Sequence, residues 1–151
     1  MTEGVDVAAL MRELSQRANS IDDASSKLMR ATQAYEGWYD ETESVDPSTG
    51  EILKTRGDWH PGPQLLWDVA VTEAAEEIAQ EYEKADKRVP AAERLRSKAE
   101  IRVKATQEDL WVDYHRLRIE IDALTKWISA RTKTLSARQS VLSAEKALVN
   151  G

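Results

Sequence analysis

From residue 64 to residue 149 the sequence contains no glycine and a single proline, Pro90. Glycine and proline are the residues that most often end helices, so their absence over this stretch favours long helices. Proline is tolerated in the first turn of a helix but not in its interior, which places a break near Pro90. The sequence therefore predicts a helix at about residues 64–88 and a very long helix at about residues 91–149, roughly 90 Å in length.

The long helix carries apolar residues at a spacing of seven. One stripe is Tyr114, Ile121, Ile128, Leu135, Leu142 and Val149, and its companion is Leu110, Leu117 and Leu124. A seven-residue repeat of this kind is typical of a coiled coil, in which another helix covers the apolar seam. We take the seam, which would also hold an oligomer together, to be Leu117, Ile121, Leu124, Ile128, Leu135 and Leu142.

Beyond Ile128 the apolar residues shift sideways to Trp127, Val141 and Leu148. A straight helix drifts in this way against a strict seven-residue repeat. The partner of the long helix is therefore expected to lie differently in this part, or to be absent. Because about 60 residues of preceding helix cannot cover the whole stripe, we expect a homo-oligomer.

A first helix is expected at about residues 5–39. Its apolar residues also recur every seven positions, as Val7, Leu14, Ile21, Leu28 and Tyr35. A second stripe of mostly small residues accompanies them, namely Met11, Ala18, Ser25 and Thr32. Small side chains at such positions let two helices approach closely.

Glycine and proline crowd into residues 37–63, between the first two helices. Asp46 and Pro47 favour a turn, and Gly50 can adopt a positive φ. Residues 40–63 are therefore predicted to be a short irregular or β-hairpin insert. The predicted fold class is all-α: a single helical domain, built as an antiparallel helical hairpin or coiled coil with one very long C-terminal helix.

Composition limits the class of protein. There is no cysteine, so disulfides and thiolate metal sites are excluded, and 32% of the residues are charged. No apolar run reaches the roughly 18 residues that a membrane-spanning helix needs. We expect a soluble, cytoplasmic protein without a membrane partner.

Motifs for catalysis are missing from the sequence. It has neither the G-x-x-x-x-G-K-[ST] loop of nucleotide hydrolases nor the G-x-S-x-G turn of serine hydrolases. Its two histidines, His60 and His115, lie outside the spacings that bind zinc or di-iron centres. We expect no enzymatic activity, no catalytic residues, no metal, no cofactor and no small-molecule substrate.

Charge is distributed unevenly along the chain. Residues 1–90 hold 9 basic and 19 acidic side chains, whereas residues 91–151 hold 12 basic and 8 acidic ones. Repeated lysine and arginine contacts bind phosphate backbones, and aromatic rings stack on unpaired bases. The candidate nucleic-acid-binding residues are Lys126, Trp127, Arg131, Lys133 and Arg138. In the alternative interpretation Trp127 packs in a core, and the basic residues complement the negative end of the helix.

The chain resembles small helical accessory proteins of bacteriophages, including the recombination mediators of T-even phages. The resemblance lies in chain length, the helical plan and the basic stretch Lys126–Lys146. It implies an oligomer that assists a recombinase on single-stranded DNA. A second resemblance, to helical-hairpin substrates of type VII secretion, rests on Tyr82 and Asp86 in a Y-x-x-x-[DE] pattern, but the W-x-G turn of those proteins is missing.

Two functions remain open. The first is a self-associating coiled-coil accessory factor in DNA recombination or replication, which contacts nucleic acid through its basic C-terminal helix. The second is a protein–protein adaptor, scaffold or inhibitor that binds a partner through its apolar seam. In both cases the partner is a macromolecule.

Overall fold

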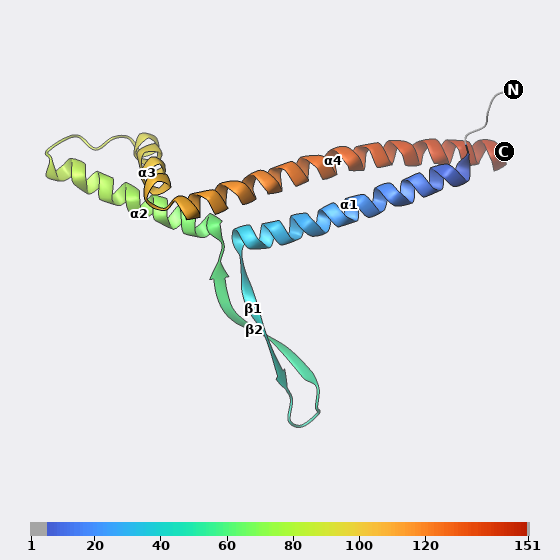
Figure 1. Ribbon diagram of the computed structural model, residues 1–151, viewed down its shortest axis with the longest axis horizontal. Coiled ribbons are helices and arrows are strands. Elements are labelled where there is room, and N and C mark those ends of the chain that lie inside the picture. The colour runs from blue at the N-terminus through green and yellow to red at the C-terminus, as the bar shows by residue number, and fades with distance from the viewer. Residues whose placement is uncertain (1–5, 151) are drawn as a thin grey trace. The chain divides into compact units, whose positions relative to one another are not determined.

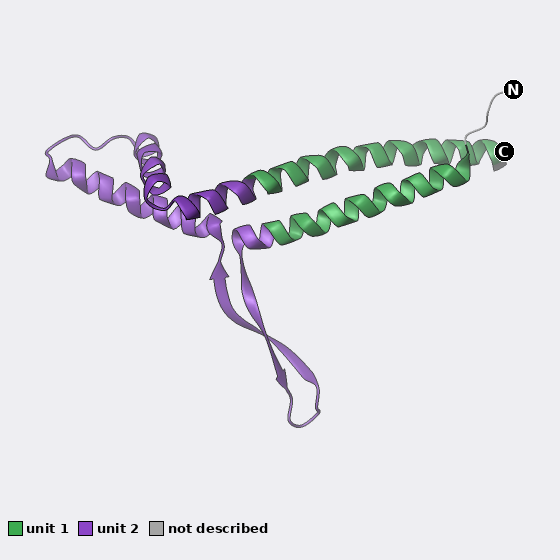
Figure 2. Ribbon diagram, in the orientation of Figure 1, with its two compact units in different colours: residues 1–31, 119–151 green, residues 32–118 purple. Residues whose placement is uncertain are grey.

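The structure, a computed structural model, describes residues 6–150 (Figure 1). Its elements follow in the order α1 (Val7–Glu36), β1 (Gly37–Val45), β2 (Ile52–Pro61), α2 (Pro63–Lys84), α3 (Ala92–Thr106) and α4 (Glu108–Asn150). They form two compact units, where the sequence predicted one helical domain. Unit 1 is residues 1–31 and 119–151, and unit 2 is residues 32–118 (Figure 2).

The predicted fold class is confirmed in its main features and wrong in one. The chain is mostly helical and ends in a long helix, as expected. It is not all-α, because residues 37–61 form a two-stranded antiparallel sheet. The insert is thus a β-hairpin, one of the two forms that the sequence allowed.

Two glycines shape this hairpin. Gly37 has a φ of +126°, which only glycine adopts without strain, and a side chain there would overlap the ring of Trp59. The positive φ ends α1 at Glu36, three residues before the predicted end of the first helix. At the tip, Gly50 has a φ of +72°, and the Asp46 carboxylate accepts hydrogen bonds from the Ser48 amide and hydroxyl.

The long helix predicted over residues 91–149 is broken at Gln107, so that prediction is wrong at this residue. Gln107 leaves the helical region, with φ −131° and ψ 60°, and separates α3 from α4. No glycine or proline marks the position. The break leaves α3 free to pack along α2, which buries Ala99 and Val103 almost completely. Tertiary packing therefore overrides the local helical preference.

Helix α2 ends at Lys84, four residues before the predicted end. Asp86 has a left-handed φ of +54°, and the Lys87 amide donates to the Tyr82 carbonyl oxygen at 2.9 Å. This closes the helix through backbone hydrogen bonds, as left-handed residues do at many helix ends. The start of α2 agrees with its sequence, since Pro63 lies in the first turn.

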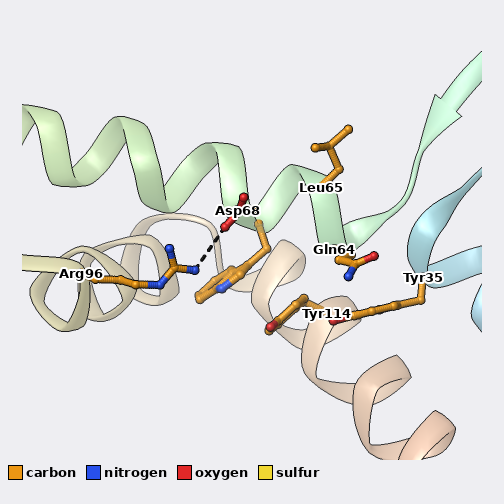
Figure 3. A pocket seen from close by; sticks show the side chains of 7 residues that line it. Tyr35, Gln64, Leu65, Asp68, Arg96 and Tyr114 are labelled. Carbon is orange, nitrogen blue, oxygen red and sulfur yellow. Dashed lines mark hydrogen bonds and ion pairs between the residues drawn. The ribbon is translucent and has the colours of Figure 1, made fainter. Parts of the chain in front are cut away.

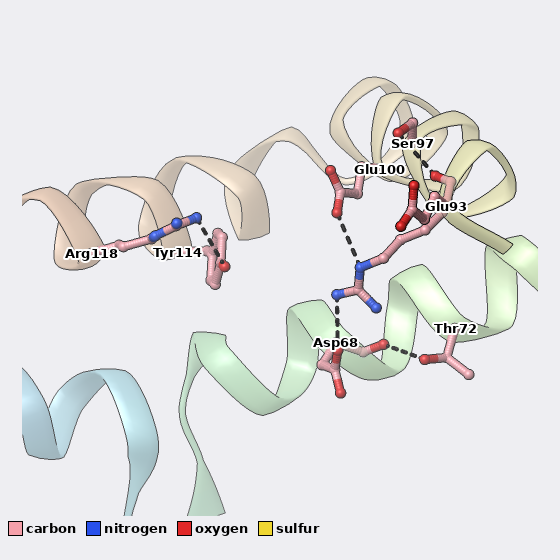
Figure 4. Close-up of polar contacts among 8 residues, drawn as sticks. Asp68, Thr72, Glu93, Ser97, Glu100, Tyr114 and Arg118 are labelled. Carbon is pink, nitrogen blue, oxygen red and sulfur yellow. Dashed lines mark hydrogen bonds and ion pairs between the residues drawn. The ribbon is translucent and has the colours of Figure 1, made fainter.

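The core of unit 2 lies between α2 and α3. It consists of Trp67, Ala70, Val71, Ala74, Ile78, Ala99 and Val103. The alanines allow the two helices to approach closely, and two exposed arginines of α3 bind acids of α2 beside this core. Arg102 forms two hydrogen bonds of 2.9 Å with Glu81. Arg96 contacts Asp68 at 3.2 Å, and Figure 4 shows Asp68 with the dashed line of this ion pair. The Arg102 guanidinium holds the pKa of the Glu81 carboxyl below its usual value.

Candidate functional site

Unit 1 is an antiparallel pair of helical segments, residues 7–31 of α1 and 119–149 of α4 (Figure 2). Arg138 of α4 lies 3.8 Å from Glu13 near the start of α1. The predicted seam residues of α4 are half-buried, Leu117 within unit 2 and the others within unit 1. Val149, which continues their seven-residue spacing, is 75% exposed.

The covering residues of α1 differ in part from those expected. Leu14 is buried, and Val7, Ile21, Leu28 and Tyr35 are at least half-buried. The companion stripe is Leu10, Arg17, Ala24 and Ala31, whereas Met11 and Ser25 of the expected stripe are exposed. The companion residues thus follow the first stripe at a spacing of three, because seam positions in a coiled coil alternate between spacings of three and four.

The seam of unit 1 is only partly covered. No side chain of residues 119–149 is buried, although this segment contains five of the predicted seam residues. A second apolar stripe runs beside the seam with a spacing of seven, broken at Thr134. Its residues are exposed: Trp127 by 37%, Val141 by 44% and Leu148 by 77%. Two helices alone therefore leave a broad apolar surface open to water.

Trp127 lies at one end of this surface and lines two cavities formed by α1 and α4 of unit 1. One cavity, of about 530 Å³, is lined by Ser20, Asp23, Ala24, Lys27, Glu120, Ala123, Leu124 and Trp127. The other, of about 360 Å³, is lined by Glu13, Gln16, Arg17, Ser20, Trp127 and Arg131. We call the two cavities together the Trp127 groove. It contains a large aromatic side chain, a small-residue floor and charged residues at both ends.

The candidate nucleic-acid-binding residues fall into three environments. Lys126 pairs with Asp122 at 2.9 Å, and Arg138 pairs with Glu13 at 3.8 Å. The Arg131 guanidinium lies 5.2 Å from the centre of the Trp127 ring. Lys133 forms no ion pair with any residue between 6 and 150. The structure thus brings Trp127 and Arg131 together and pairs two of the other three cations with acids of the same unit.

Sequence reasoning missed the α1 side of the groove. Glu13, Arg17 and Ser20 line it, yet they were not singled out. Arg17 carried a signal, since it lies three residues after Leu14 and interrupts an otherwise apolar companion stripe. A charged residue at a seam position lowers the stability of a coiled coil and helps to fix its register and oligomeric state.

Unit 2 has a separate cavity of about 390 Å³, lined by an aromatic cluster and an ion pair (Figure 3). Tyr114 stacks on Trp67 at 5.1 Å and on Tyr35 at 5.7 Å between ring centres. Burial, and next the hydrogen bond with Tyr114, raise the pKa of the Tyr35 hydroxyl to about 12. Arg96 is the one arginine in the lining of this cavity, and it forms an ion pair with Asp68. The stacked rings of Tyr35, Trp67 and Tyr114 hold α1, α2 and α4 together within unit 2.

Within residues 6–150, no three histidine, cysteine or carboxylate residues are grouped so that they could hold a metal ion. None of the helices described has the length and apolar character needed to cross a membrane. Comparisons with protein-family models, with curated proteins and with solved structures gave no match.

Proposed function

We propose that this chain is a non-catalytic scaffold protein that assembles with further copies of itself through the helical pair of unit 1. The observation that carries the proposal is the open seam. In residues 119–149 every seam residue remains partly exposed, and a second apolar stripe lies unpaired beside it. Apolar surface of this kind is favourable to bury, at about 25 cal/mol per Å².

A third and fourth helix would complete the packing of unit 1. Helices in bundles bury a stripe at least 100° wide, and that stripe must touch more than one neighbour. The α4 segment has such a stripe, formed by the seam on one side and by Trp127, Val141 and Leu148 on the other. Helix α1 covers the first side. The helices of a second copy cover the side that contains Trp127, Val141 and Leu148.

Sedimentation equilibrium over a dilution series tests this proposal. We expect the wild-type chain to show a mass that rises with concentration from the monomer value of 17.0 kDa to at least twice that value in the high micromolar range. Because apolar burial drives the association, moderate salt should change it little. A mass that stays at 17.0 kDa throughout would rule the scaffold function out.

Nucleic-acid contact is the second candidate function, and one observation favours it. Unit 1 holds 9 basic and 8 acidic residues, whereas unit 2 holds 12 basic and 19 acidic ones, so the cations are concentrated relative to the acids in unit 1. Lys133, which has no ion-pair partner within residues 6–150, and Arg131 over Trp127 offer a cation and a stacking ring. This candidate corresponds to an accessory factor in DNA recombination or replication.

A mobility-shift assay with single-stranded DNA separates the two candidates. If the cations bind phosphate, affinity should fall with salt at a log–log slope near −3, because about four contacts each contribute roughly −0.7. Replacing Lys126, Arg131, Lys133 and Arg138 with glutamine should abolish the shift. An unshifted DNA band at low salt, with the assembly intact, would exclude this candidate and leave the scaffold function.

A further inference from the structure

We infer that two copies pair through the Trp127 groove in an antiparallel arrangement, with a two-fold axis that passes between the two α4 helices beside residues 125 and 126. The inference rests on the proposed self-association and adds to it the face, the partner and the register. An interface between identical copies is usually two-fold, so that a residue i contacts j and j contacts i. The groove must therefore be complementary to itself.

The shape of the groove meets this requirement. Trp127 lines both cavities, and the lining of the larger one includes Ala24, Ala123 and Leu124. Rotation about an axis near residues 125 and 126 places the indole of each copy over Ala123 and Leu124 of the other. A tryptophan that enters a preformed pocket at the centre of an interface is a common hot spot of binding energy.

The residues involved lie on one face of α4. At 100° per residue, Glu120 and Arg131 are within about 40° of the direction of Trp127, whereas the seam residue Ile121 is about 120° away. The face that would meet the second copy thus adjoins the seam that α1 covers, and the seam residue Leu124, about 60° from Trp127, belongs to both. Val141 lies on the same side and extends the apolar stripe.

Charge is also complementary across this axis. Arg17 and Arg131 line the cavity on one side of Trp127, together with Glu13, which is bound to Arg17 at 2.9 Å. Asp23 and Glu120 line the cavity on the other side, together with Lys27. An antiparallel second copy brings Arg131 of each chain to Glu120 of the other, twice in one interface. A parallel arrangement would instead place like charges together, which is unfavourable.

Charge reversal at these two positions tests the pairing. We expect Glu120→Arg alone, and Arg131→Glu alone, each to weaken self-association on the order of tenfold, because each creates two like-charge contacts. An equimolar mixture of the two variants should recover the wild-type affinity, since every contact in the mixed pair then joins an arginine to a glutamate. Sedimentation velocity of the single variants and of the mixture measures both effects.

Lys133→Glu is the matched control. It reverses a charge on the same helix and in the same unit, but about 120° from Trp127 around α4. Its mass distribution should equal that of the wild type, and circular dichroism should show equal helicity for all variants. The pairing is overturned if the single variants associate like the wild type, or if their mixture stays monomeric while the wild type associates. A wild-type chain that is itself monomeric would overturn the scaffold function as well.

Discussion

Replacing Trp67 with alanine should destabilise unit 2 by about 3–5 kcal/mol, a large share of the roughly 5–15 kcal/mol that stabilises a typical domain. Trp67 is only 5% exposed and belongs to the core between α2 and α3. Its ring also stacks on Tyr114 of α4 at 5.1 Å between centres. The substitution therefore removes the largest side chain of the core and the stacking contact together, and leaves a cavity that the alanine-rich surroundings cannot fill.

Urea denaturation monitored by near-ultraviolet circular dichroism measures this loss. The control is Trp38→Ala, which removes the same side chain from the hairpin, where it is 48% exposed. We expect that variant to lose about 1 kcal/mol or less, because mainly the contact with His60 is removed. Equal destabilisation by the two variants would contradict the core assigned to unit 2.

Leu14→Asp should separate the two helices of unit 1. Leu14 is 9% exposed and faces the seam of α4, so the change deletes buried apolar groups and introduces a carboxylate with no partner. Truncation of a buried leucine alone costs about 2–5 kcal/mol, and burial of the charge adds to that cost. Most of the stability of a helix in a protein comes from the packing of its apolar face, so residues 119–149 should lose helix as well.

Hydrogen exchange of the amides in residues 119–149 reads out the separation directly. Met11→Asp is the control, three residues away on the same helix but 47% exposed. We expect exchange in residues 119–149 to be faster in Leu14→Asp and unchanged in Met11→Asp. Faster exchange in Met11→Asp together with unchanged exchange in Leu14→Asp would mean that the structure assigns the wrong face of α1 to the pair.

The helices could be predicted because their signals are local. Apolar residues at a spacing of seven, and the absence of glycine and of any proline but Pro90 from residues 64–149, are visible without knowledge of any partner. The break at Gln107 could not be predicted, because it depends on how Ala99 and Val103 pack against α2. The left-handed conformation of Asp86 is only weakly signalled by its residue type, because aspartate adopts this conformation more often than most residues but far less often than glycine.

The candidate site, too, could be predicted from the sequence only in part. The exposed stripe through Trp127, Val141 and Leu148 follows from periodicity, so the sequence indicated a change of partner beyond Ile128. The surroundings of the basic residues could not be predicted from periodicity, because the ion pair between Arg138 and Glu13 depends on the register of α1 against α4. The same register creates the two cavities beside Trp127, which no single segment of the sequence contains.

Trp127→Ala, compared with the wild type in one sedimentation equilibrium experiment, tests the central claim most directly. The wild-type chain should sediment at high micromolar concentration as a species of twice 17.0 kDa, and the variant at 17.0 kDa with unchanged helicity. Trp59→Ala, which removes an exposed tryptophan from the hairpin, should behave like the wild type. Equal masses for the wild type and for Trp127→Ala would contradict self-assembly through the groove of unit 1.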